Sequence, residues 1–217
     1  MIHIKIENKS YPIPSTWYDL KFRHQLALIE KPLSNIELLS LFTGLDIEKL
    51  RDAQIKGLEL AIAAWSFLQK PMVYDSKITK CGKYELPLNS KGEFNIQFES
   101  LAQFEDMNAI MFKVPDKNSY EHTKAYTMYC AIYLQKLRDG VYSLDKAEGM
   151  RDEVLDMPAH EVITLGGFFF VKLLTLLHGT TNGFQSTKPM SKKKKPVSRN
   201  SQKRLGHTGR SSTRRGK

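Results

Sequence analysis

The sequence predicts a mainly helical α+β protein with a short N-terminal β-hairpin, a central β-hairpin, about six to seven helices and a disordered basic C-terminal tail. Apolar residues alternate with polar residues in residues 2–6 and 94–98, which is typical of strands with one buried face. Apolar residues recur at helical spacing through most of the remaining body. The basic residues are concentrated at the C-terminus.

Residues 2–14 predict the first hairpin. The isoleucines at positions 2, 4 and 6 lie on one face of a strand, Asn8-Lys9 supplies the turn, and Tyr11 and Ile13 return. Pro12 and Pro14 lack the amide donor that a ladder needs, so the second strand is expected at a sheet edge.

Helices are expected to complete a first unit over residues 1–70. Ser34 followed by Glu37 fits a capping box, and Gly44 fits the residue that ends that helix. Residues 53–69 read as one longer apolar helix that Pro71 ends.

Residues 71–185 predict a second unit, or the rest of a single domain with 1–70. Strands 84–88 and 94–98 flank the turn 89–92 and form the central hairpin. Helices follow from Ser100, over 120–137, over 144–155 and from Pro158 to Gly179.

The C-terminal residues 186–217 contain 12 of the 33 Lys and Arg residues and no Asp or Glu. The rest of the chain has 21 basic and 23 acidic residues, so the formal charge of +10 belongs to the tail. Such a segment is expected to be disordered and to bind DNA or RNA independently of sequence. A solubilising appendage and a nuclear import signal are the alternatives. The candidate nucleic-acid contacts are Lys192, Lys193, Lys194, Lys195, Arg199, Lys203, Arg204, Arg210, Arg214 and Arg215.

Apolar and glycine residues in two helices are the candidate protein interface. Two adjacent glycines inside a helix each cost about 1 kcal/mol relative to alanine, and their usual use is close approach of another backbone. The neighbouring aromatic rings supply a large contact area, either within the fold or between subunits. The predicted interface residues are Trp65, Phe67, Gly166, Gly167, Phe168, Phe169 and Phe170.

No catalytic, cofactor-binding or metal-binding motif is found, and the sequence predicts a protein that is not an enzyme. The chain has no phosphate-binding glycine loop, no GxSxG and no HExxH. His160-Glu161 is an adjacent pair of His and carboxylate, and a surface or capping pair is expected there. Cys81 and Cys130 are expected to be buried small residues, with metal ligation as the alternative.

The apolar segment 162–177 raises the question of a membrane span. It is 16 residues long and contains one charge, Lys172. A span needs roughly 20 apolar residues, so a buried or partner-facing helix is expected, with an interfacial helix as the alternative. The N-terminus does not read as a signal peptide, and two distant cysteines favour a reducing cytoplasm.

The first 70 residues resemble tail-assembly-chaperone-like proteins of tailed-phage morphogenesis modules. The shared pattern is a hairpin, a Pro-Ser/Thr-Trp helix entry and a Thr-Gly-hydrophobic step into an Asp-capped turn. The residues that show it are Tyr11, Ile13, Pro14, Trp17, Leu20, Gln25, Leu41, Thr43, Gly44, Leu45 and Leu50. Proteins of this kind bind unassembled structural proteins and have no catalytic residues.

The expected function is therefore a non-enzymatic phage assembly or virion-associated protein. Its apolar helices would bind phage structural proteins, and its tail would contact a polyanion. The alternative is a sequence-independent nucleic-acid-binding protein. The resemblance implies the cytoplasm of the host cell, or the virion, as the location, and the sequence leaves a homo-oligomer open.

Overall fold

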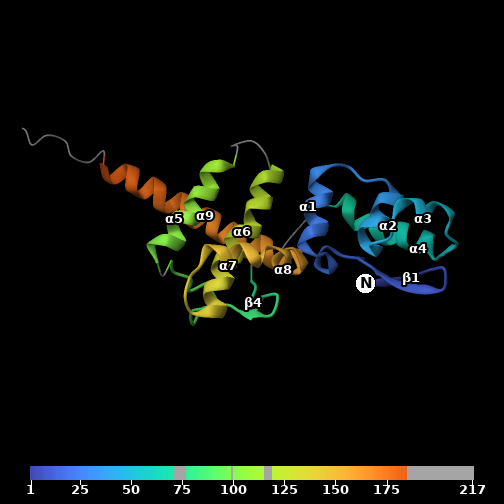
Figure 1. Cartoon of the computed structure of the whole chain (residues 1–217), viewed down its shortest axis with the longest axis horizontal. Coiled ribbons are helices and arrows are strands. Elements are labelled where there is room, and N and C mark those ends of the chain that lie inside the picture. Colours follow the sequence, from blue (N-terminus) through green and yellow to red (C-terminus); the bar gives the residue numbers. More distant parts are fainter. Residues whose placement is uncertain (71–76, 99, 115–118, 185–217) are drawn as a thin grey trace, which may run out of the picture.

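The computed structural model in Figure 1 describes residues 1–70, 77–98, 100–114 and 119–184. It confirms a mainly helical α+β fold with a short N-terminal hairpin and a second small sheet. The molecule is elongated: the N-terminal elements lie at one end, and the last helix projects past its neighbours at the other.

The N-terminal sheet has the strand order β2-β1-β3, formed by β1 (Ile2–Ile6), β2 (Lys9–Ile13) and β3 (Ile55–Lys56). Strand β2 lies at the edge, as its prolines predict, and Pro12 pairs with His3. The turn lies one residue earlier than expected, because Glu7 and Asn8 are the two residues with positive φ.

The expected single helix over residues 53–69 is wrong. Residues Ile55–Lys56 add to β1 as the third strand, and Gly57 breaks the chain direction at φ +91°. Helix α4 (Leu58–Ala64) follows, and the 3-10 helix η2 (Trp65–Gln69) continues it. This segment pairs with the edge of β1 instead of continuing the helix. Local apolar spacing carries no information about such a distant pairing partner.

Three helices lie between β2 and β3 in the sequence. After the 3-10 turn η1 (Trp17–Asp19), they are α1 (Phe22–Glu30), α2 (Asn35–Thr43) and α3 (Ile47–Asp52). The predicted capping box of α2 is confirmed. The Glu37 carboxylate accepts a hydrogen bond from the Ser34 amide at 2.8 Å, and Ser34 Oγ accepts one from the Glu37 amide at 3.4 Å. Gly44 ends α2 in the left-handed conformation.

The central hairpin pairs differently from expectation. Strand β5 (Tyr84–Glu85) pairs with β4 (Lys80–Cys81), and residues 84–88 meet 94–98 only at the single bridge between Leu88 and Phe94. The alternating aromatic residues of 94–98 contact helices instead: Phe94 packs on Phe168, and Phe98 packs on Phe104 and Phe169. Their alternation therefore reflects burial against helices and not a two-stranded ladder.

The later helices are α5 (Leu101–Lys113), α6 (Ser119–Asp139), α7 (Leu144–Gly149), α8 (Arg151–Asp156) and α9 (Ala159–Phe184). The expected helix over 144–155 is divided at Met150. Helix α9 packs along α6 and also contacts α1 and β4.

Helix α1 joins the two ends of the molecule. The Phe22 amide donates to the Met157 carbonyl at 2.9 Å, and the Ala159 amide donates to the Leu20 carbonyl at 2.8 Å. Asp156 accepts ion pairs at 2.9 Å from both Lys21 and Arg23. One continuous apolar core runs through both ends, so the base of α9 is held by the N-terminal part.

Candidate protein-binding surfaces

The fold separates the seven predicted interface residues into two groups. Trp65, Phe67, Gly166 and Phe169 are buried. Gly167, Phe168 and Phe170 are partly exposed. Buried side chains contribute to packing and cannot meet a partner through exposed area, so the predicted interface is corrected to the partly exposed group and its neighbours.

Gly166 and Gly167 have different roles although they are adjacent. A Cβ atom at Gly166 would lie 2.5 Å from Tyr126 Cβ and 2.6 Å from Tyr126 Cγ, so this glycine permits the close crossing of α6 and α9. A Cβ at Gly167 would meet no described atom within 4 Å. Of the two alternatives for the pair, packing within the fold explains Gly166, and Gly167 faces outward.

The outward side of α9 is an apolar surface, which we call the α9 face. It surrounds a shallow hollow of about 440 Å³. Val171, four residues after Gly167 on the same side of the helix, is 61% exposed. The sequence reasoning missed Val171, although its spacing from Gly167 was the available signal. The α9 face consists of Phe94, Thr164, Gly167, Phe168, Val171 and Lys172.

Lys172 is the single charged residue of the apolar segment, and its side chain contacts other parts of the fold. Its ammonium donates to the Ile96 carbonyl and lies 5.5 Å from the ring centroids of both Phe98 and Phe168. Burial lowers the pKa of Lys172. The charge is thus turned toward the loop and the aromatic rings. The other residues of the α9 face are uncharged, and all but Thr164 are apolar.

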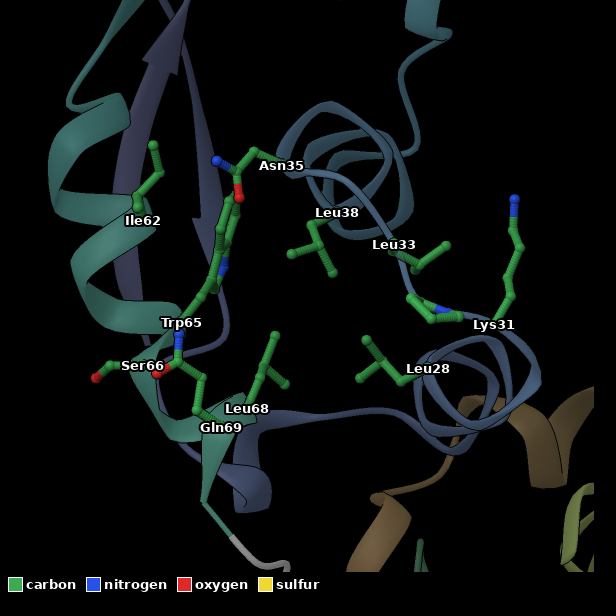
Figure 2. Close-up of a pocket in the computed structure, with 11 residues that line it drawn as sticks. Leu28, Lys31, Leu33, Asn35, Leu38, Ile62, Trp65, Ser66, Leu68 and Gln69 are labelled. Atoms are coloured by element: carbon green, nitrogen blue, oxygen red, sulfur yellow. The ribbon is translucent and has the colours of Figure 1, made fainter.

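A second hollow, which we call the Trp65 groove, lies between α1, α2 and the α4–η2 segment (Figure 2). Its volume is about 380 Å³. Figure 2 shows Trp65 on one wall, with Leu28, Leu33 and Leu38 on the side opposite it. Lys31 pairs with Glu37 at 2.9 Å. The lining residues are Leu28, Lys31, Pro32, Leu33, Asn35, Leu38, Ile62, Trp65, Ser66, Leu68 and Gln69.

His160 and Glu161 lie in the first turn of α9. Glu161 is buried, contrary to the surface pair that the sequence suggested, and its Oε2 accepts the Gly82 amide of the β4–β5 turn at 2.6 Å. His160 Nε2 lies 3.9 Å from Glu161 Oε1. Burial lowers the pKa of His160, against the opposing effect of Glu161, and so favours the neutral imidazole. Glu161 therefore anchors the small hairpin to α9.

In the part of the chain that the structure describes, no group of three or more His, Cys, Asp and Glu side chains is placed to hold a metal ion. The ten predicted nucleic-acid contacts of the tail, from Lys192 to Arg215, lie outside the described residues. Their interpretation therefore rests on the charge pattern of the sequence.

Helix α9 is long and apolar enough over Ala159–Leu177 to cross a membrane, by length and composition alone. This window has a mean hydropathy of 1.5, and 33% of it is buried inside the protein. A core helix of a soluble protein passes the same test, so the criterion does not distinguish the two.

No protein-family model, curated protein or solved structure matches this chain. The proposal for its function therefore rests on the surfaces described above.

Proposed function

We propose that this chain is a non-enzymatic binding protein that uses the α9 face to cover an apolar surface of a structural protein during assembly. The observation that carries the proposal is the exposed apolar area around Val171, flanked by Phe168 and Gly167 on a helix whose other side is packed. Exposed contiguous apolar patches mark interaction sites, because leaving them in water costs free energy. A phage structural protein is the partner class that the N-terminal resemblance implies.

The basic tail supplies a second contact in this proposal. It follows α9 directly in the sequence and contains 12 cationic residues. Phosphate contacts by such a segment release counterions and favour any polyanion. Charge segregation also supports the second candidate function, a protein that coats DNA or RNA through its tail without reading sequence.

The contacts of α9 support a packed helix and not a membrane span. Phe169 and Leu173 are buried, and the ring centroid of Phe169 lies 5.1 Å from that of Tyr133. Glu161 and Lys172 each bind a backbone group of another segment. A helix that left for a bilayer would give up these contacts, and its two charged side chains would need new partners.

Co-purification from the native lysate with Val171→Asp and Val141→Asp variants tests the proposal. Val141 is the matched control, because it is 74% exposed, has the same side chain and lies on the turn between α6 and α7. We expect Val171→Asp to lose a protein partner that wild type and Val141→Asp retain, because an aspartate on the α9 face would be desolvated on binding.

A nuclease treatment separates the two candidate functions. A partner that stays bound after nuclease and leaves with Val171→Asp supports contact through the α9 face. A partner set that nuclease removes, equally from wild type and both variants, contradicts it and favours the nucleic-acid-binding alternative.

A further inference from the structure

The fold brings the chain's two cysteines against the same short segment, although they are distant in sequence. Cys81 lies on β4 and Cys130 on α6, and both are fully buried with free thiols. The Cys81 thiol contacts Met157 Sδ at 3.7 Å, and the Cys130 thiol donates to the Val162 carbonyl at 3.5 Å.

Two further contacts fix the Cys81 side of this arrangement. The next residue, Gly82, has φ +59°, and a Cβ there would lie 2.9 Å from the Met157 side chain. The Gly82 amide also binds the Glu161 carboxylate. The start of α9 thus holds the β4–β5 turn. Burial, followed by interaction with the Cys81 thiol, raises the pKa of Cys130 well above its usual value.

We propose that Cys81 and Cys130 form a modification site: an intramolecular disulfide that joins the β4–β5 hairpin to α6 when a small-molecule disulfide oxidant is present. The inference does not depend on the proposed function, because it uses neither the α9 face nor the tail. The chain has exactly two cysteines, so only one intramolecular disulfide can form.

The oxidation balances with oxidised glutathione as the oxidant. The Cys81 thiolate attacks the glutathione disulfide, forms a mixed disulfide and releases one glutathione thiolate. The Cys130 thiolate then attacks the Cys81 sulfur and releases the second. One disulfide forms in the chain, one breaks in the oxidant, and the two cysteine protons end on the two glutathione thiols.

Burial limits the rate of this exchange but not its equilibrium. A buried thiol with a raised pKa supplies little thiolate, so exchange requires opening of the hairpin, whose strands have two residues each. At equilibrium, the folded chain holds both thiols against the segment at the start of α9. This raises the effective concentration for ring closure above that of the unfolded chain.

The test is to denature and reduce the full chain, then equilibrate it with a fixed couple of reduced and oxidised glutathione, in folding buffer and in concentrated urea. Acid quenching and intact-mass analysis count the monomer that has lost two hydrogen atoms. We expect the ratio of this disulfide form to the dithiol to be at least about tenfold higher in folding buffer than in urea. Peptide mapping should link Cys81 to Cys130.

Single variants Cys81→Ser and Cys130→Ser are the controls, and each should keep its remaining cysteine as a free thiol or as a glutathione adduct. Equal disulfide ratios in folding buffer and urea would overturn the proposal. Glutathione adducts on both cysteines of the folded monomer, or disulfide-linked dimers as the main product, would also overturn it.

Discussion

The glycine pair of α9 gives a test in which two neighbouring substitutions should have different effects. Gly166→Ala places a methyl group 2.5 Å from Tyr126 Cβ, a distance at which one of the two helices must move. Gly167→Ala places the same methyl group where no described atom lies within 4 Å. Both changes occur inside the same helix, so Gly167→Ala is the matched control for Gly166→Ala.

The magnitude follows from two terms. Alanine in place of glycine favours a helix by about 1 kcal/mol, and this gain is common to both variants. Overpacking of a filled contact costs about 1–3 kcal/mol and applies only to Gly166→Ala. We therefore expect Gly167→Ala to exceed Gly166→Ala in free energy of unfolding by about 1–3 kcal/mol, which corresponds to about 2–12 °C in melting temperature for a chain of this size.

Urea and thermal denaturation followed by far-ultraviolet circular dichroism measure this difference. Wild type should lie between the two variants if the overpacking term exceeds the helix term. A Gly166→Ala variant that is as stable as Gly167→Ala would refute the close crossing of α6 and α9 at Tyr126.

Three further predictions concern the tail, a partly buried histidine and the core of α9. A chain that ends at Gln185 should melt within a few degrees of the intact chain and should lose DNA binding. The intact chain should bind DNA of any sequence. If about six phosphates are neutralised, log K should fall with a slope of about −5 against log salt. Burial, assisted by Lys21 and Arg23, lowers the pKa of His24 from 6.5 to about 4. Because the unfolded chain then binds more protons in this range, about 3 kcal/mol of unfolding free energy should be lost as pH falls from 6.5 to 4, and a His24→Gln variant should lose less. Phe169→Asp should cost more than about 3 kcal/mol and cause aggregation in detergent-free expression, because it replaces a buried ring with an unpaired charge.

Each of these predictions has a clear contrary result. Tight DNA binding by the shortened chain would place the nucleic-acid site in the folded body. A variant at His24 with the same acid profile as wild type would assign the acid sensitivity to other groups. Recovery of the intact chain only in the carbonate-resistant membrane pellet would show that α9 spans a membrane.

Local signals predicted the parts of the fold that local interactions determine. The capping box at Ser34 and the left-handed Gly44 were readable because their hydrogen bonds stay within a few residues. Strand β3 was not, because Ile55–Lys56 forms a strand only by pairing with the distant β1. Residues 94–98 show the opposite error: their alternation is real, but helix α9 and not a strand covers their aromatic side chains.

The candidate surfaces were predicted less well, for a related reason. Aromatic residues near the two glycines of α9 satisfy both a core and an interface, and only the position of α6 shows that Phe169 is covered. Val171 lacks an aromatic ring and was overlooked, although it is the most exposed residue of the α9 face. The pairing of Cys81 and Cys130 with the start of α9 depends on contacts between distant segments and leaves no local pattern.

Photo-crosslinking from position 171 is the most direct test of binding through the α9 face. A benzoylphenylalanine residue is placed at Val171 and, as the control, at the similarly exposed Val141, and each chain is irradiated in native lysate after nuclease treatment. We expect one discrete crosslinked protein from position 171 and none from position 141. The same products from both positions, or no crosslinked protein from position 171, would contradict a partner on the α9 face.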